Sequence, residues 1–555
     1  MRGRARHARS TGPASPPLAI VLALALTAVS LAAQNGSAPT ITSQDILAGL
    51  ANPNRWLTYS GEYNGRRHSP LTQITPANVG RLTAQWTFQA ETLALNRGFE
   101  ATPLAVDGIL YVTGSFNYAW AIDGRTGRPF WKYRRELPNN LTYGAAAPVN
   151  RGFAILGDRL FMVTLDAHLL AMDSRTGSVI WDTVLADYRV GYSATLAPLV
   201  VNDKIIVGIS GGEYPTRGFL DAYDPQTGNR VWRFYTVPGA GEKGSETWPN
   251  TDAIARGGGG TWMTGSYDPA LNMIYWGTGN PNPDYYGSDR EGDNLYTCSL
   301  VALDANTGAL KWHYQFTPHD IHDWDANQIP VLADLTIGGS PKKVVMMANR
   351  NGFFYVLDRT TGKLLLARPF GEQRWAREIG VDGRPIVLNE TGEKECIPDA
   401  HGSTNFMPPS FDPARGLFFV TARETCSAYV PMKPEFKPGA STTGGGVRRV
   451  VGNTYGALRA IDPTTGDRKW EFRYPTPTLA GVMSTASGLV FAGDSEGNFT
   501  AVDARTGKPL WHYPMGASIW GAAAMTFMLD GRQHIVIASG NTLVAFALPG
   551  VTASP

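Results

Sequence analysis

The sequence contains few cysteines, no marked excess of charge of either sign and one long apolar run. Its 555 residues include three Cys, namely Cys298, Cys396 and Cys426, which is too few for a disulfide-rich scaffold. No Cys-x-x-Cys-His motif occurs, and this absence excludes a covalently attached c-type haem. The formal net charge is +2 and there is no basic cluster, so the composition indicates no nucleic-acid partner.

The long apolar run lies near the start of the chain. Four Arg residues in the first nine positions precede the run from Leu18 to Ala33, which ends in small residues. This order is typical of a secretory signal peptide, so we expect residues 1–33 to be removed and the protein to be periplasmic. A retained membrane anchor is the alternative, but the run is short for a span. We expect no membrane span in the mature protein, and an N-terminal segment over residues 34–55.

A ten-residue pattern, here called the Asp-Thr-Gly repeat, recurs seven times along the rest of the chain. An apolar residue is followed by Asp-x-x-Thr-Gly, and six copies end in Trp four residues after the Gly. The Asp residues of the seven copies are Asp123, Asp173, Asp224, Asp304, Asp358, Asp462 and Asp503. An Asp side chain can cap a turn and Gly supplies the positive φ that such a turn needs. The repeat therefore predicts the tight turn of a β-hairpin.

The spacing of the repeat predicts an architecture. Several steps are about 50 residues, the length of a four-stranded propeller blade. The longer step from Asp358 to Asp462 leaves room for a blade without the repeat, and Ser410 to Ala422 supplies strand-like sequence there. We therefore expect an all-β, eight-bladed β-propeller over residues 56–548, with Trp-docking motifs between blades and a tail at 549–555. The strand around Leu82 to Phe88 is expected to close the ring by pairing with the last blade.

The densest polar cluster, TPHDIHDWDANQ, runs from Thr317 to Gln328. Its residue types fit an ordinary polar loop, a zinc site using His319 and His322, or a site where carboxylates bind a hard cation and act as a base. Taken singly, Glu213 in SGGE is typical of a loop charge and Asn280 in GTGNP of a turn. The four glycines at 257–260 do not precede Lys-Ser/Thr, so they form no phosphate-binding loop.

In this order along the chain, the repeats, SGGE, GTGNP and PHDxxDWDA resemble the dehydrogenases that depend on pyrroloquinoline quinone (PQQ) and oxidise alcohols. The resemblance runs from about Trp56 to about Ala547. It implies a quinoprotein alcohol dehydrogenase, without a haem c domain, that oxidises an alcohol by hydride transfer to metal-bound PQQ. Since the chain cannot attach haem, the electrons are expected to pass to a separate acceptor such as cytochrome c.

The resemblance also implies a role for individual residues. Asp323 matches the catalytic base and Arg350 the cation beside the quinone oxygens. The metal ligands match Glu213, Asn280 and Asp323. Asp325 lies where lanthanide-using members have an Asp, so we expect either Ca²⁺ or a lanthanide ion. The residues that match PQQ contacts are Glu100, Arg151, Thr195, Ser210, Gly211, Gly212, Trp262, Arg350 and Asn405, with Trp262 stacked under the ring.

Other positions depart from the family pattern or leave the substrate open. Ala145 and Ala146 stand where many members have a disulfide between adjacent Cys residues, whereas Cys396 and Cys426 match a disulfide of many members. Leu479 replaces a Trp of methanol-oxidising members, which favours an alcohol larger than methanol, or a sugar. The alternatives are a PQQ-dependent aldose or polyol dehydrogenase and a non-enzymatic periplasmic scaffold.

Overall fold

The computed structural model of the chain describes residues 40–91, 98–141, 147–388, 398–450 and 454–550. The predicted signal peptide, Ala145, Ala146 and Cys396 lie outside these residues, as do the last five positions of the predicted tail. Among the residues that are described, no helix is both long and apolar enough to cross a membrane.

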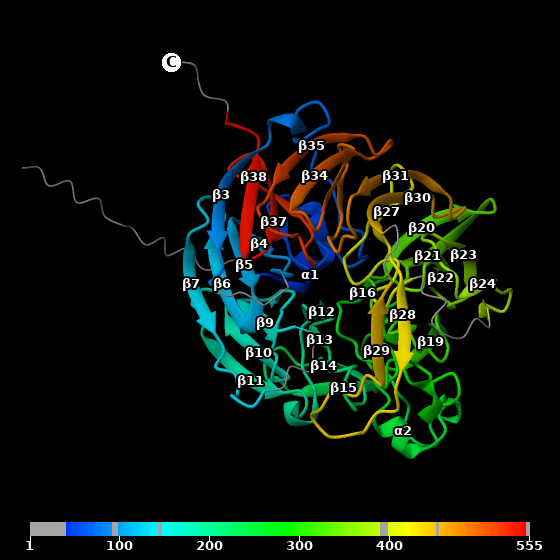
Figure 1. Ribbon diagram of the computed structural model, residues 1–555. Coiled ribbons are helices and arrows are strands. Elements are labelled where there is room, and N and C mark those ends of the chain that lie inside the picture. The colour runs from blue at the N-terminus through cyan, green and yellow to red at the C-terminus, as the bar shows by residue number, and fades with distance from the viewer. Residues whose placement is uncertain (1–39, 92–97, 142–146, 389–397, 451–453, 551–555) are drawn as a thin grey trace, which may run out of the picture. The chain divides into compact units, whose positions relative to one another are not determined.

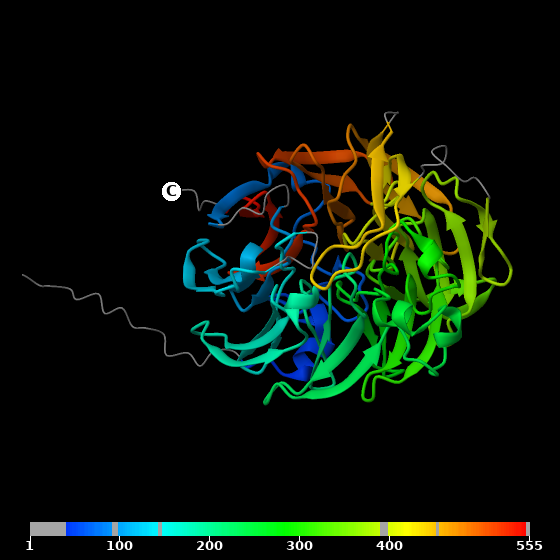
Figure 2. The same ribbon diagram turned by 60° about the horizontal axis from the view of Figure 1, so that its bottom comes forward.

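Eight sheets form the blades of a β-propeller in the described part of the chain (Figures 1 and 2). Each has four antiparallel strands, and two of them have a fifth strand, which is parallel in the seventh blade. The first four blades contain β4 (Leu104–Val106), β5 (Ile109–Thr113), β6 (Tyr118–Asp123) and β7 (Pro129–Arg134); β8 (Ala154–Leu156), β9 (Arg159–Val163), β10 (His168–Asp173) and β11 (Val179–Val184); β12 (Leu199–Val201), β13 (Lys204–Gly208), β14 (Phe219–Tyr223) and β15 (Arg230–Tyr235); and β16 (Ser266–Asp268), β17 (Met273–Gly277), β18 (Ser299–Asp304) and β19 (Leu310–Gln315).

The next three blades follow the same order along the chain. They contain β20 (Val331–Ile337), β21 (Ser340–Ala348), β22 (Phe353–Asp358) and β23 (Leu364–Pro369); β26 (Ser410–Asp412), β27 (Leu417–Glu424), β30 (Tyr455–Ile461) and β31 (Arg468–Tyr474); and β32 (Met483–Thr485), β33 (Leu489–Gly493), β34 (Asn498–Asp503) and β35 (Pro509–Pro514). Two N-terminal strands extend blades, β1 (Arg55–Trp56) the first and β2 (His68–Ser69) the seventh. The two short α-helices among the described residues, α1 (Ser43–Ala48) and α2 (Thr251–Ala255), lie outside the sheets.

The eighth blade joins the two ends of the propeller. It contains β36 (Met525–Leu529), β37 (Arg532–Ser539) and β38 (Thr542–Ala547), and β3 (Thr83–Gln89) pairs antiparallel with β38. The expected closure through the strand around Leu82 to Phe88 is thereby confirmed. A strand from the start of the chain and three from its end form one sheet, so neither end leaves an open sheet edge between blades.

The predicted position of the blade without the repeat was wrong. Ser410 to Ala422 does form strands, β26 and β27, but β27 pairs with β30, so both strands belong to the blade that carries the Asp462 repeat. The extra length before Asp462 instead contains two additional hairpins, β24 (Ala376–Ile379) with β25 (Pro385–Val387), and β28 (Ser427–Pro431) with β29 (Gly445–Arg449). The blade that lacks the repeat is the closing one.

The core lies between the faces of neighbouring blades. In the second blade, the side chains of β9 and β10 are buried almost throughout, whereas the outer strand β11 alternates between exposed and half-buried positions. A strand that is covered on both faces reads as a continuous apolar run, and a strand at the rim does not. The same pattern recurs in the first blade, where β5 and β6 are buried and β7 alternates.

The Asp-Thr-Gly repeat forms the turn between the third and fourth strands of the first seven blades. In the second blade, Asp173 Oδ1 accepts hydrogen bonds from the backbone N–H groups of Arg175 and Thr176, at 2.9 and 3.0 Å. Gly177 completes this turn with φ = 73°. The hairpin turn predicted from the Asp and Gly positions is therefore confirmed.

The Trp that ends a repeat contacts the repeat of the next blade. The indole N–H of Trp131 donates to Ser174 O at 2.9 Å, and a Cβ added to Gly177 would lie 2.6 Å from Trp131 Cε3. The same pairing of an indole and a Gly recurs for Trp86 with Gly127, Trp181 with Gly228, Trp232 with Gly308, Trp312 with Gly362 and Trp470 with Gly507. Where Leu366 replaces Trp, Gly466 lies against Leu366 and the aliphatic part of Arg368.

This close approach predicts that Gly177→Ala destabilises the protein more than a strained backbone alone would. Gly157 is a matched control, because it also has a positive φ (65°) but an added Cβ would meet nothing within 4 Å. We expect Gly157→Ala to cost about 1–2 kcal/mol from backbone strain. Gly177→Ala should cost about 1–3 kcal/mol more, because its Cβ displaces the Trp131 indole. Urea unfolding measures the difference, and equal losses for the two variants would contradict the contact.

Candidate active site

The antiparallel order within each blade brings the predicted site residues to one edge. The start of a blade's first strand lies beside the end of its second strand, as in the third blade, where Leu199 pairs with Ile206. Thr195 precedes the first strand of that blade and Ser210 follows the second. Trp262 and Asn280 occupy the equivalent positions in the fourth blade, so the same edge supplies the site residues of both blades.

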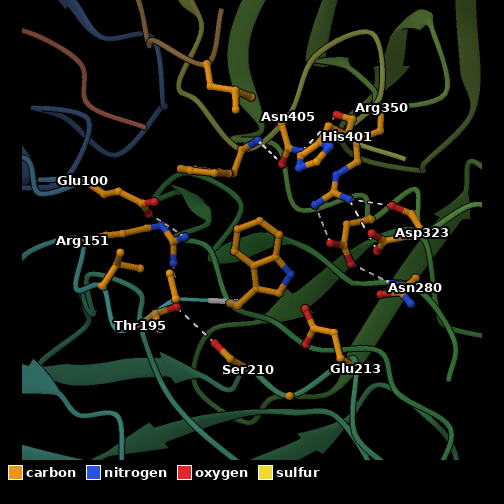
Figure 3. A pocket seen from close by; sticks show the side chains of 18 of the residues that line it. Glu100, Arg151, Thr195, Ser210, Glu213, Asn280, Asp323, Arg350, His401 and Asn405 are labelled. Carbon is orange, nitrogen blue, oxygen red and sulfur yellow. Dashed lines mark hydrogen bonds and ion pairs between the residues drawn. The ribbon is translucent and has the colours of Figure 1, made fainter. Parts of the chain in front are cut away.

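A single pocket at this edge contains residues from all eight blades. It has a cavity of about 120 Å³ (Figure 3). It is lined by Glu100, Ala147, Val149, Arg151, Thr195, Ser210, Gly211, Gly212, Glu213, Trp262, Asn280, Asp323, Asp325, Arg350, His401, Asn405, Phe406, Leu479 and Trp520. Every residue that the sequence assigned to PQQ, to the metal or to catalysis lies in this set. The structure therefore brings them together, while their individual roles stay predictions.

One side of the pocket is a chain of polar contacts from the first three blades (Figure 3). Arg151 Nη2 lies 2.8 Å from Glu100 Oε2, with side chains only 6% and 0% exposed. Arg151 Nη1 donates to Thr195 Oγ1 at 2.6 Å, and Thr195 Oγ1 lies 3.1 Å from Ser210 Oγ. Because both ends of the ion pair are buried, the guanidinium of Arg151 is held in one orientation.

The opposite side contains two carboxylates and a second guanidinium (Figure 3). Arg350 Nη2 donates to Asp325 Oδ2 at 2.7 Å, and Arg350 Nη1 donates to the backbone oxygen of Asp323 at 2.6 Å. Arg350 Nη1 also lies 3.6 Å from Asp323 Oδ1. Asp325 Oδ1 accepts from the backbone N–H of Asn280 at 2.8 Å. Asp323 itself adopts a left-handed backbone conformation, φ = 65°, as strained residues at functional sites often do.

Electrostatics set Asp323 apart from an ordinary carboxylate. Burial, reinforced by the negative charges of Asp325 and Glu213, raises the pKa of Asp323 well above its usual range, and Arg350 opposes this only in part. The side chain nevertheless keeps 29% of its surface exposed. Burial also raises the pKa of Asp284, with further contributions from Asp323 and Glu213. A carboxyl group with a raised pKa in a pocket is a candidate proton acceptor.

The predicted metal ligands are not gathered into a closed cluster. In the part of the chain that the structure describes, no three His, Cys, Asp or Glu side chains are grouped so that they could enclose an ion. Asp325 is paired with Arg350, and it is the backbone N–H of Asn280, not its side chain, that donates to Asp325. Of the two His residues weighed for zinc, His319 contacts Gly292 O and His322 stacks on Trp324. The ligand roles of Glu213, Asn280, Asp323 and Asp325 therefore stay predictions.

The pocket fits a planar anionic cofactor. The guanidinium carbons of Arg151 and Arg350 lie 5.0 and 5.8 Å from the ring centre of Trp262, so an aromatic surface and two cations share the cavity. The Nε atoms of both arginines are buried and have no hydrogen-bond partner. Buried donors of this kind normally have acceptors. PQQ is a flat quinone with carboxylate groups, and it would supply both a stacking surface and acceptors.

Several lining residues escaped the sequence reasoning. Val149, Phe406 and Trp520 add apolar surface, and His401 lies near Asn405, whose Nδ2 donates to His401 O at 3.0 Å. No repeat or motif marks these residues. The sequence could have indicated them only by their position along the chain. Each lies shortly before the first strand of a blade, as Arg151 and Trp262 do.

Cys298 and Cys426, the two cysteines among the described residues, do not line the pocket. Cys298 is a buried free thiol. Burial raises its pKa well above the usual value, which keeps the thiol protonated. The predicted partner of Cys426, Cys396, lies outside the described residues, so the disulfide stays a prediction.

Comparisons with known proteins agree with this fold and pocket. A family model described as the glucose/ethanol/alcohol dehydrogenase β-propeller domain matches residues 56–378, and a model described as outer membrane protein assembly factor BamB matches residues 437–554. The quinoprotein alcohol dehydrogenase PedH of Pseudomonas putida is 36% identical over 95% of this chain and 92% of its own length.

Two further relatives are described by the metal they use. The lanthanide-dependent methanol dehydrogenase of Methylacidiphilum fumariolicum is 36% identical over 91% of this chain and 88% of its own. The solved structure of a europium-containing methanol dehydrogenase superposes with a TM-score of 0.86 at 33% identity, covering 91% of this chain and 100% of that one.

The propeller and its pocket thus define a quinoprotein type of oxidoreductase. The chain belongs to the family of PQQ-dependent alcohol dehydrogenases, as the family model and the relatives above show. The family resemblance inferred from the sequence motifs is confirmed.

The buried Arg151–Glu100 pair predicts that Glu100→Gln lowers the stability of the protein without cofactor. The substitution leaves the Arg151 charge buried without its counter-charge, which typically costs about 3–5 kcal/mol. Glu435→Gln is the control, because Glu435 pairs with Lys437 through side chains that are 79% and 64% exposed. Such exposed pairs contribute little. Urea unfolding followed by circular dichroism measures both variants, and a stability of Glu100→Gln equal to that of the control would contradict the prediction.

Proposed function

We propose that the protein is a periplasmic quinoprotein dehydrogenase that oxidises an alcohol to an aldehyde or ketone. It would use PQQ with Ca²⁺ or a lanthanide ion and pass electrons to a separate acceptor such as cytochrome c. The observation that carries the proposal is the convergence of all the family-matched site residues on one pocket. The absence of a haem-attachment motif supports a separate electron acceptor.

In the proposed reaction, Asp323 accepts the proton of the substrate hydroxyl. Its side chain is partly open to the cavity and its pKa is raised, both of which suit a general base. Arg350 donates to Asp325 and to the backbone of Asp323, which holds its guanidinium in place beside the base. PQQ, when bound, supplies the electrophilic quinone that accepts the hydride, with the metal as a Lewis acid.

The remaining predicted contacts would bind and orient the cofactor. Trp262 supplies a flat surface, and Arg151, fixed by Glu100 and Thr195, supplies a positive charge on the side opposite Arg350. Two cations on opposite sides of an aromatic surface favour one orientation of a flat, carboxylate-bearing ring. Such positioning is the main contribution of a protein to cofactor chemistry.

The carboxylates favour an ion of high charge. Glu213, Asp323 and Asp325 all line the pocket, and three carboxylates suit a trivalent ion better than a divalent one. A relative described as lanthanide-dependent and a europium-containing solved structure support this direction. In the structure Asp325 pairs with Arg350, so metal binding would require Asp325 to share its charge between the two.

The pocket wall favours an alcohol with an apolar substituent. Val149, Phe406, Leu479 and Trp520 line it, and Leu479 packs beside Trp520 through a backbone bridge. An aldose or polyol carries several hydroxyl groups that need hydrogen-bonding partners, which an apolar wall does not provide. The alternative of a scaffold without catalytic function does not account for the grouping of several ionisable side chains around one cavity.

Features outside the pocket complete the proposal. We propose that residues 1–33 are a signal peptide followed by an N-terminal segment to residue 55, and that Cys396 pairs with Cys426. The repeated Trp residues would act as docking motifs between blades. The indole–Gly contacts and the hydrogen bonds to the next blade support this last role.

A reconstitution assay tests the proposed function. The full chain is loaded with PQQ and either Ca²⁺ or La³⁺, and reduction of an artificial dye is followed over a panel of alcohols and sugars. We expect activity with alcohols larger than methanol and little with sugars. Asp323→Ala should lose at least about 100-fold in kcat while still binding PQQ, because it removes the base and one proposed metal ligand but none of the residues proposed to contact the quinone.

Asp187→Asn is the control for Asp323→Ala, because Asp187 is an exposed residue that pairs with Arg189 and does not line the pocket. It should leave activity unchanged. Normal turnover by Asp323→Ala would contradict the assignment of the base. Failure of the wild-type chain to bind PQQ with either metal would contradict the function itself.

The choice of metal depends on Asp325 in this proposal. Asp325→Ala should lower the activity with La³⁺ about 10- to 100-fold relative to that with Ca²⁺, because the trivalent ion loses a carboxylate. Asp325→Asn, which keeps the shape of the side chain, separates the loss of charge from the loss of packing. An unchanged ratio of La³⁺ to Ca²⁺ activity in both variants would show that Asp325 is not a ligand.

A further inference from the structure

Asp284 is a buried carboxylate next to the pocket that the family motifs do not include. Its residue is only 1% exposed, and it is absent from the pocket lining. It lies four residues after Asn280, in the segment that follows β17. Burying a carboxylate is costly unless it has a specific partner, so the position of Asp284 calls for one.

The partner of Asp284 is the side chain of Asn280. Asn280 Nδ2 donates to Asp284 Oδ1 at 2.9 Å and also lies 3.2 Å from the backbone oxygen of Pro281. Both of these oxygens therefore accept from the nitrogen of the carboxamide and not from any other atom of the side chain. A carboxamide can rotate by half a turn and exchange its nitrogen and oxygen, and only its hydrogen bonds decide which orientation is favoured. Here they place the nitrogen toward Asp284 and leave the oxygen on the other side.

The amide oxygen of Asn280 faces the glycines that precede Glu213. A Cβ added to Gly212 would lie 3.1 Å from Asn280 Oδ1, so this oxygen approaches the backbone of the Gly212–Glu213 segment. The backbone N–H of Asn280 is held by Asp325 Oδ1 at 2.8 Å. The side-chain oxygen of Asn280 thus lies toward the Gly212–Glu213 segment while its backbone is fixed on Asp325, and a hard cation prefers oxygen ligands of this kind.

We propose that Asp284 is a positioning residue that fixes the Asn280 carboxamide with its oxygen directed at the metal. The inference rests on the proposed metal site but goes beyond it, because Asp284 acts through Asn280 and does not itself contact the ion. Partners that orient a ligand are commonly worth about 10- to 100-fold in metal affinity. Without Asp284 the carboxamide can turn, and its nitrogen cannot bind a cation.

Metal affinity tests this role without relying on turnover. The full chain is stripped of metal and titrated with Tb³⁺, whose luminescence is sensitised by a nearby indole such as Trp262, and competition with Ca²⁺ extends the measurement. Asp284→Asn retains an oxygen acceptor and should bind within about threefold of the wild type. Asp284→Ala and Asp284→Leu have no acceptor and should bind about 10- to 100-fold more weakly.

Two controls isolate the contact with Asn280. Asp252 is exposed in α2, so Asp252→Ala should leave Tb³⁺ binding unchanged. Weaker binding by this variant would show that the titration measures adventitious binding to surface carboxylates. In an Asn280→Ala background, Asp284→Ala should cause no further loss, since no carboxamide remains to be oriented. Circular dichroism checks that each variant folds. Asp284→Leu resembles Asp284→Asn in shape, so it replaces Asp284→Ala if that variant is unstable.

Three results would overturn the proposal. Unchanged binding by the folded Ala and Leu variants would mean that Asp284 does not position Asn280. Equal losses in the Asn and Ala variants would mean that the charge of Asp284, or direct coordination, matters instead. If the wild-type chain bound no Tb³⁺ in the pocket, the proposed metal site would fall along with this inference, whereas the first two results leave the metal site intact.

Discussion

The pairing of β3 with β38 is the interaction on which the site depends. It joins a strand from the start of the chain to strands from its end, and so closes the sequence of blades into a ring. Residues at one edge of every blade then face one cavity, to which Glu100 comes from the first blade and Trp520 from the last. Without closure, the first and last blades would be free to separate, and the polar chain from Glu100 to Ser210 would lose its fixed relation to Leu479 and Trp520. The geometry of the pocket is thus a property of the whole chain.

Charge is the second constraint on the pocket. Glu213, Asp323 and Asp325 repel one another in a partly dry cavity, and Arg350 offsets only part of that repulsion. A folded chain without ligand therefore holds an excess of negative charge beside a single guanidinium. A bound cation relieves the repulsion, whereas a neutral ligand does not, which is why binding of the metal and stability of the pocket should be coupled. The cofactor side differs, because the Arg151 charge is already matched by Glu100.

The sequence predicted those parts of the fold that depend on a single turn or a single motif. The Asp and Gly of the repeat fix a turn by their own hydrogen bonds and φ, so seven hairpins could be predicted from the sequence. The eighth blade could not be placed in the same way. It lacks the repeat and is assembled from both ends of the chain, and the strand-like sequence at Ser410 to Ala422 belongs to the sixth blade. The motif residues of the pocket were found together, but His401 and Asp284 belong to no motif, and only the folded chain shows their contacts.

The segment between β28 and β29, yellow in Figure 2, shows how an insertion can support the site from a distance. The backbone N–H of Thr442 donates to Glu213 O at 2.7 Å, and Thr442 Oγ1 donates to Asn282 Oδ1 at 3.1 Å. Asn282 Nδ2 in turn donates to Gly212 O at 3.1 Å. An insertion in the sixth blade thus links the segments that carry Glu213 and Asn280, which come from the third and fourth blades. Since a metal ion needs its ligands at fixed distances, such links reduce the ordering that binding would otherwise require. The two hairpins account for the extra length that the sequence interpretation assigned to the eighth blade. One of them, β28 with β29, carries the segment whose hydrogen bonds link Glu213 to Asn282, so this extra length has a structural role at the pocket.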